Sequence, residues 1–202
     1  MEEVLSMEAR KTRIISASIA LFIGAFCCAS IQGKVQAPKL NDLIKHSDLI
    51  AEGRVTKIVV VRGVRIARLD LARVHKGSPT IKRLYLWASP TWVCDISGAE
   101  LNESGLYFLT LVKDKQSTSG NAEFGHELDG VLQGDRLYTI SWSGYGRLIN
   151  KSGGMLQASD YVRFPRTVAV RYISTGDYSS VALVDARDIV WLIHTSRQRR
   201  GV

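Results

Sequence analysis

The stretch that decides the fold is AEGRVTKIVVVRGVRIARLDLARV, residues 51–74. Its first half is rich in β-branched residues, which are typical of strands. Arg62-Gly63 then provides a turn, and apolar and polar residues alternate from Val64 to Val74. We therefore expect two long strands, over 51–61 and 64–74, that pair as an antiparallel hairpin.

Further strand patterns follow the hairpin. Residues 75–79, HKGSP, have the composition of a turn, and the alternation over 81–87 predicts a third strand. LYFLTLV, residues 106–112, has the length and apolar character of a buried strand. Short strands separated by turn signals favour a closed barrel or a sandwich over an α/β fold.

Helices are predicted at both ends of this β-rich region. Leu40, Leu43 and Ile44 have helical spacing and indicate a short helix within 39–49. After a polar loop over 113–123, strands are expected at 137–142, 168–173 and 180–184, with turns at 143–146 and 151–154. Asp185 is placed to cap a final helix over 186–197.

The N-terminus has the pattern of a secretory signal peptide. Arg10, Lys11 and Arg13 precede an uncharged stretch over 14–33 that ends in small residues. We expect cleavage after Ala29 or Ser30, which removes residues 1–30, or close to that, and makes the protein secreted or periplasmic. The alternative is an uncleaved membrane anchor over 14–33, which has about the 20 apolar residues that a spanning helix needs.

Composition sets limits on the partners and on the disulfides. The chain has 202 residues with 27 basic and 19 acidic ones, a net charge of +8 that suits anionic partners. Cys27 and Cys28 lie in the expected signal peptide, so the mature chain keeps only Cys94. One cysteine forms no internal disulfide, and packing must hold the fold. Cys94 remains a candidate for a disulfide between two copies.

One part of the chain resembles a known family. SDLIAEGRV (47–55), LDLARVHKGSPTIKRLYL (69–86) and WVCDISGAELNESGLYFLTLV (92–112) are similar to the inhibitory domain of the tissue inhibitors of metalloproteinases, the netrin-like superfamily. Uncharacterised bacterial exported proteins carry a similar pattern. The family fold is an OB-type five-stranded barrel, which agrees with the strands expected from the residues themselves.

The resemblance covers roughly residues 40–113 and implies a fold rather than an activity. The animal inhibitors chelate zinc through a mature N-terminal cysteine, and no Cys-x-Cys follows an expected cleavage site here. The resemblance places Cys94 where relatives have a disulfide cysteine. We expect a mainly β protein with an OB-like barrel over 38–113, a short N-terminal helix, and a β-rich extension over 124–202 that ends in a helix.

The strongest charge feature is a basic stretch along the expected hairpin. On a barrel surface such a stretch is a candidate anion-binding surface. Export and the lack of stacking aromatics on these strands argue against nucleic acid. Anionic envelope polymers or lipid head groups suit the stretch better, and a merely solvated hairpin explains it as well. Its members are Arg54, Lys57, Arg62, Arg65, Arg68, Arg73 and Lys76.

Other residues belong to types that carry chemistry in proteins. No motif ties His46, His75, His126 or His194 to Cys94, which makes a cysteine nucleophile the weaker interpretation. GHELD, residues 125–129, resembles a metal cluster, but the surrounding glycines predict a solvated loop. Trp142, Tyr145 and Arg147 form either an aromatic and cationic surface or, as we expect, a β-turn with Tyr138 and Trp142 facing the core.

These patterns identify no catalytic residues, cofactor or metal. The leading hypothesis is an exported, non-enzymatic binding module whose partner is a protein or an anionic envelope component, with inhibition of a protease as one role. No nucleic acid is expected, and a membrane only if the N-terminal segment stays uncleaved. The alternative hypothesis is an envelope hydrolase with a site between barrel and extension.

Overall fold

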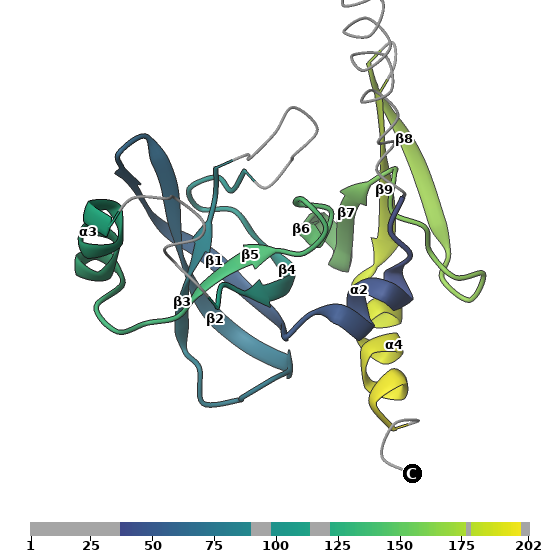
Figure 1. Ribbon diagram of the computed structural model, residues 1–202. Helices are drawn as coiled ribbons and strands as arrows, with labels where there is room; N and C mark the ends of the chain where they lie inside the picture. Colours follow the sequence, from purple (N-terminus) through teal and green to yellow (C-terminus); the bar gives the residue numbers. More distant parts are fainter. Residues whose placement is uncertain (1–36, 90–97, 114–121, 177–178, 199–202) are drawn as a thin grey trace, which may run out of the picture. The chain divides into compact units, whose positions relative to one another are not determined.

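The computed structural model describes residues 37–89, 98–113, 122–176 and 179–198, all within the compact unit Ala37–Val202 (Figure 1). The elements begin with a short helix and alternate mostly between strands. Their bounds are α2 (Leu40–His46), β1 (Leu49–Val61), β2 (Val64–Lys76), β3 (Arg83–Trp87), β4 (Ser104–Leu111), α3 (Ala122–Leu132), β5 (Leu137–Ile140), β6 (Arg147–Asn150), β7 (Met155–Ser159), β8 (Val170–Gly176), β9 (Ser179–Asp185) and α4 (Ala186–Gln198).

Five strands close into a barrel in the order β1-β2-β3-β5-β4, and β4 pairs back onto β1. Every pair is antiparallel except β3 with β5, which run parallel. Leu69, Leu84, Leu86, Tyr107 and Leu109 are fully buried and belong to one core cluster. The predicted fold class is confirmed: a mainly β protein with a five-stranded barrel, an N-terminal helix and a C-terminal β-plus-helix extension. The closing strand β5 lies beyond the range 38–113 that we expected for the barrel.

The β1–β2 hairpin forms where the sequence predicts it. Val61 pairs with Val64, and Arg62 and Gly63 make the turn with φ angles of 47° and 83°. Two positive φ angles in a two-residue turn suit the right-handed twist of the flanking strands. The strands extend two residues past the predicted ends on one side, to Leu49 and Lys76.

The segment around Gly125 and Gly130 is a helix, α3, and the predicted solvated loop is wrong. Phe124, Leu128 and Leu132 repeat every four residues and are buried against barrel residues that include Trp87. Each glycine in a helix costs about 1 kcal/mol relative to alanine. Burial of each large apolar side chain gains about 1.5–3 kcal/mol, which outweighs that cost.

The extension continues the sheet from β4 through β6, β7, β9 and β8. The sequence did not predict β6 or β7, which have only four and five residues. Gly105 permits the β4–β6 contact, because a Cβ at this position would lie 2.2 Å from the carbonyl oxygen of Leu148. Tyr138 is buried as expected, whereas Trp142 is 38% exposed in a turn with positive φ and does not face the core.

The final helix α4 forms as predicted, with Asp185 at its start. The backbone N–H of Arg187 donates to Asp185 Oδ1 at 2.8 Å, which satisfies one of the free donors of the first turn. Ile189 and Ile193 are fully buried on one face. Among the described residues, no helix combines the length and apolar character needed to cross a membrane.

Candidate functional site

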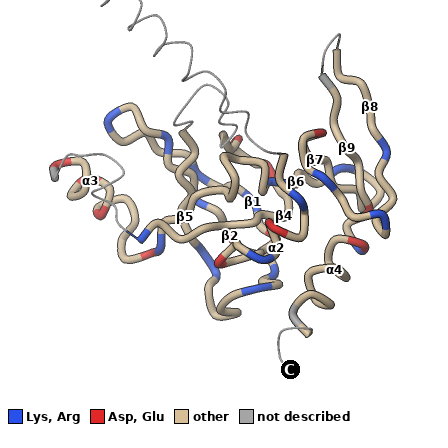
Figure 2. Tube along the Cα trace, turned by 45° about the vertical axis from the view of Figure 1, so that its right-hand side comes forward, with Lys and Arg blue, Asp and Glu red and all other residues tan. Residues whose placement is uncertain are grey.

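All seven cations of the predicted basic surface lie on the β1–β2 hairpin, and basic positions follow its strands in Figure 2. Their side chains are not equally available to a ligand. Arg54, Arg62, Arg65, Arg68 and Lys76 each contact acceptors elsewhere in the chain. These contacts determine which of the seven cationic side chains can still bind an anion.

Lys76 is used to close helix α2. Its Nζ donates to the carbonyl oxygens of Ile44 at 2.9 Å, Lys45 at 3.1 Å and Ser47. The last carbonyls of an α-helix have no partner within the helix and need donors from elsewhere. Lys76 supplies such donors from the end of β2, so its charge stabilises the helix C-terminus.

Arg62 connects the hairpin turn to α3. Its guanidinium lies 2.9 Å from a Glu123 oxygen and 2.8 Å from a Glu127 oxygen. The hydrogen bond with Glu127 is the main cause that raises the pKa of Arg62 above its usual value, and the hydrogen bond with Glu123 is the second. Acidic positions gather on α3 next to the basic hairpin in Figure 2.

Arg65 and Arg54 hold the segment that leads into β4. Arg65 Nη2 donates to the carbonyl of Ala99 at 3.2 Å and lies 3.5 Å from Glu100. Arg54 Nη2 donates to Asn102 Oδ1 at 3.0 Å. Both cations therefore act as contacts within the fold.

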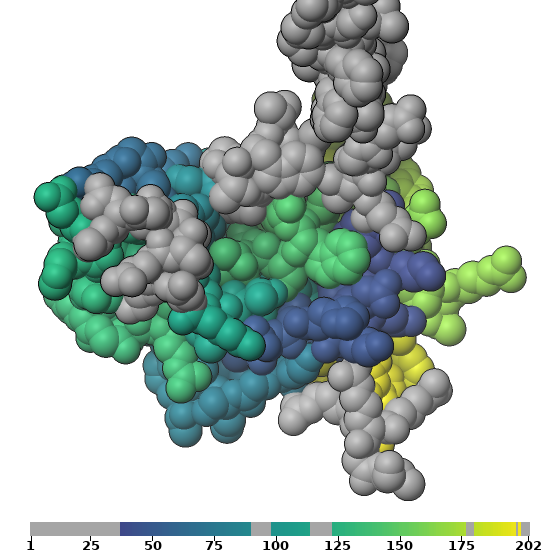
Figure 3. Space-filling view, viewed as in Figure 1, coloured from purple at the N-terminus to yellow at the C-terminus, as the bar shows by residue number. Residues whose placement is uncertain are grey.

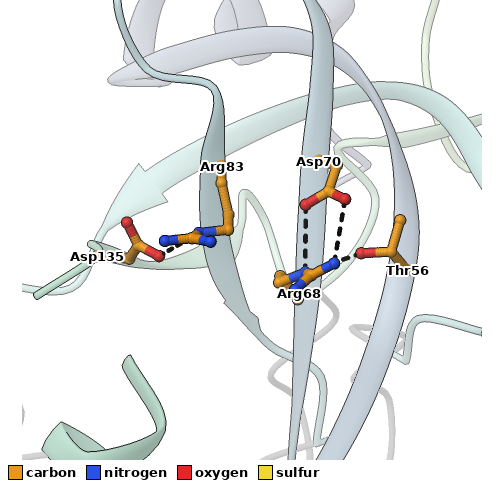
Figure 4. Close-up of polar contacts among 5 residues, drawn as sticks. All are labelled: Thr56, Arg68, Asp70, Arg83 and Asp135. Carbon is orange, nitrogen blue, oxygen red and sulfur yellow. Dashed lines mark hydrogen bonds and ion pairs between the residues drawn. The ribbon is translucent and has the colours of Figure 1, made fainter. Parts of the chain in front are cut away.

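Arg68 lies in a polar contact on the barrel surface (Figure 4). Its Nε donates to Thr56 Oγ1 at 2.9 Å and lies 3.2 Å from Asp70 Oδ1. Lys57 and Arg73 make no ion pair or side-chain hydrogen bond with any residue that the structure describes. Among the described residues, the hairpin thus offers two cations without partners rather than seven, and its role in anion binding stays a prediction.

A second basic region surrounds a cleft of about 430 Å³ at one end of the barrel. The turn between β2 and β3 forms one wall, and the residues that lead into β5 form the other. The lining residues are Ser78, Thr80, Ile81, Lys82, Arg83, Gly134, Asp135 and Arg136.

The parallel pairing of β3 with β5 creates this cleft. Tyr85 pairs with Leu137, and the backbone N–H of Tyr85 donates to the carbonyl of Arg136 at 3.0 Å. Because neighbouring parallel strands begin at the same end of a sheet, the polar residues at their starts lie together. The sequence alone did not predict this site. The charged pairs Lys82-Arg83 and Asp135-Arg136 stand in the sequence, but they indicate a shared site only when β3 and β5 are known to be neighbours.

Asp135 orients Arg83 within the cleft (Figure 4). Arg83 Nε donates to Asp135 Oδ2 at 2.5 Å, and this hydrogen bond raises the pKa of Arg83. The terminal Nη groups of Arg83 have no partner within the described part of the chain. A guanidinium that is fixed at Nε and open at Nη has the fork geometry that binds carboxylates and phosphates.

The cleft carries a net positive charge. Lys82 and Arg136 are exposed and form no ion pair with a described residue, while Asp135 neutralises one of the three cations. The Ser78 and Thr80 hydroxyls, 2.8 Å apart, add polar groups to the same wall. This arrangement favours an oxyanion, and salt in the solution will weaken the attraction.

Two histidines, which the sequence left unconnected, meet between β2 and α4. His75 Nε2 lies 2.7 Å from Glu52 Oε1, and its ring packs edge-on against His194 with centroids 5.6 Å apart. His75 is only 1% exposed, so its ring is a buried contact between barrel and helix. The residues described contain no group of three or more His, Cys, Asp or Glu side chains placed to hold a metal ion.

Arg147 has a different partner from the aromatic surface that we considered. Its Nη1 lies 3.4 Å from Glu103 Oε2, and the Tyr107 hydroxyl donates to Glu103 Oε1 at 3.1 Å. Burial raises the pKa of Tyr107 far above its usual value, so its hydroxyl stays protonated. The three side chains form a polar contact within the fold.

Cys94 lies outside the described residues, and its predicted disulfide between copies stays a prediction.

No protein-family model matches the chain, and no curated protein matches it significantly.

Proposed function

We propose that this protein is an exported, non-enzymatic binding module that holds an anionic group of its ligand in the cleft at Lys82, Arg83 and Arg136. The observation that carries the proposal is Arg83, whose Nε is fixed by Asp135 while its Nη groups have no partner in the described chain. A guanidinium held in this way loses less conformational freedom when it binds an oxyanion. The ligand group is a carboxylate or a phosphate.

Export rests on the pattern of the N-terminal segment. Arg10, Lys11 and Arg13 before an uncharged stretch favour removal of residues 1–30. Mass spectrometry of the protein from its native cells should find a start between Ala29 and Gln32. An intact N-terminus in the membrane fraction would instead establish an anchor.

Binding is tested with two small oxyanions, pyrophosphate and citrate, by isothermal titration calorimetry at low salt. In Lys82→Gln/Arg136→Gln, two cations without ion-pair partners in the described chain are removed from the cleft. We expect this variant to weaken binding by about tenfold or more, because charge-assisted hydrogen bonds are lost.

The matched control is Lys57→Gln/Arg73→Gln, which removes the same charge from the hairpin. It should weaken binding by less than about twofold, since distant exposed charges are screened. Equal losses in the two variants, or no binding of either anion to the natural protein, would refute the proposal.

A hydrolase is the second candidate function, because Glu52 and His75 form a carboxylate–imidazole pair between the barrel and α4. Such a pair activates nucleophiles in hydrolases. A panel of ester, peptide and glycan substrates separates the two functions. Turnover that is lost in His75→Gln and kept in Lys82→Gln/Arg136→Gln would favour the hydrolase.

A further inference from the structure

Strand β8 lies at the outer edge of the sheet. The strand order ends at β8, which pairs with β9 on one side and has no other pairing among the described strands (Figure 1). Every β8 residue from Arg171 to Gly176 is exposed. At the right of Figure 3, light-green atoms project in the colour of the chain that leads into β8. The second edge of this strand is therefore open to solvent in the described structure.

The edge carries few of the devices that usually prevent strand addition. Natural edge strands are protected by charged side chains, especially lysine, by proline, by bulges or by very short length. β8 has seven residues with no proline or lysine and one charged residue, Arg171, and its only register shift lies at its end, between Ser174 and Gly176. Tyr172 and Ile173 are 58% and 39% exposed, and successive residues point to opposite faces of a strand. An added strand would thus find an apolar side chain on each face.

The charges on β8 and on the segment that leads into it are positive. Residues 161–176 contain three arginines and no aspartate or glutamate, and the carboxylate that precedes them, Asp160, accepts a hydrogen bond from the Ser180 hydroxyl of β9. Arg163, Arg166 and Arg171 are exposed and form no ion pair with the residues that the structure describes. An acidic strand is complementary to this region, whereas a second copy of the chain would bring like charges together.

We propose that β8 is the docking edge for an extended acidic segment of a partner protein, which adds a strand to the sheet. Backbone hydrogen bonds to β8 give the affinity, and the arginines select for acidic side chains. This interaction is separate from the oxyanion cleft and does not depend on it.

The test uses fluorescein-labelled peptides and fluorescence anisotropy. The first probe is a hexapeptide of alternating Glu and Val, and the second has Lys in place of Glu. Two further acidic probes carry N-methyl groups on alternate amides, one on the odd and one on the even positions. In an added strand only one of these two sets of amides faces β8.

We expect the acidic probe to bind about tenfold more tightly than the basic one, and one N-methylated probe to lose binding while the other keeps it. Equal binding of both N-methylated probes would show attraction by charge without strand addition and would overturn the proposal. Failure of the acidic probe to bind would do the same.

Two variants locate the interaction. Arg171→Glu should weaken acidic-peptide binding by about tenfold, while the matched charge reversal Arg73→Glu on the hairpin should change it by less than about twofold. Equal effects of the two variants would place binding elsewhere and overturn the proposal.

Bound peptide should also slow amide hydrogen exchange in β8. Sedimentation of the free protein tests a second copy of the chain as the occupant. If the protein self-associates and the acidic peptide does not disrupt the association, a second copy occupies the edge and the proposal is overturned.

Discussion

The β1–β2 hairpin and the cleft beside β3 both concentrate basic side chains, but the fold uses their charges differently. On the hairpin, Arg62 and Arg65 are engaged by acceptors from neighbouring segments. In the cleft, Lys82 and Arg136 have no ion-pair partner among the described residues, and Arg83 keeps its Nη groups available. The donors left after folding, rather than the number of cations, therefore indicate a binding surface.

Position in the topology explains this difference. The hairpin is long and passes close to α3 and to the segment before β4, so most of its cations find acceptors within reach. The cleft cations lie at the starts of β3 and β5. Asp135 is the one carboxylate among the residues that line the cleft there. We therefore expect hairpin cations to act in folding and cleft cations to act in binding.

The largest effect is expected from Lys76→Met, which keeps an unbranched apolar stem and removes the ammonium donors. Three carbonyl groups at the end of α2 lose their donor, which should lower the free energy of unfolding by about 2 kcal/mol. Urea unfolding followed by circular dichroism measures the loss. Arg73→Gln is the control and should change stability little. An unfolding curve for Lys76→Met like that of the natural protein would show that this hairpin cation is dispensable for folding.

The next effect concerns binding rather than folding. Arg83→Lys keeps the positive charge but removes the planar fork that Asp135 orients. Binding of pyrophosphate should weaken by about tenfold by calorimetry, with the thermal midpoint nearly unchanged. If lysine binds as well as arginine, charge alone recognises the anion, and the orientation by Asp135 has no role.

A smaller effect is expected from Arg62→Asn. Asparagine tolerates the positive φ of this turn position, so the substitution isolates the ion pairs with Glu123 and Glu127. The thermal midpoint should fall at low salt, and the difference from the natural protein should vanish in about 1 M NaCl, where exposed charges are screened. A difference that persists at high salt would mean that the turn geometry, not the ion pairs, is affected.

The smallest effect lies at the start of α4, where the fold again uses an arginine internally. Hydrogen bonds from Arg187 lower the pKa of Asp185 to about 2. A carboxyl with a lowered pKa in the folded state stabilises the protein above its ordinary pKa, and this contribution is lost as pH falls towards about 2. The thermal midpoints of the natural protein and Asp185→Asn should therefore converge between about pH 4 and pH 2. A constant difference across this range would contradict the role of the charge.

The sequence predicted the parts of the fold whose signals are local. The β-branched run before Arg62-Gly63 and the apolar strand at 106–112 needed no knowledge of their neighbours. Helix α3 was missed because its glycines are local evidence against a helix, while the burial of Phe124 and Leu128 depends on the barrel. The cleft was missed for the same kind of reason, because Lys82 and Arg136 come together only through the parallel pairing of β3 and β5.

The most direct test of the central claim maps the bound anion by NMR. Pyrophosphate is titrated into ¹⁵N-labelled protein at low salt, and the amide shifts are followed residue by residue. The largest shifts should fall on residues 78–83 and 134–136, and they should disappear in Lys82→Gln/Arg136→Gln. Shifts centred on Lys57 and Arg73 of the hairpin, with the cleft amides unchanged, would contradict the account.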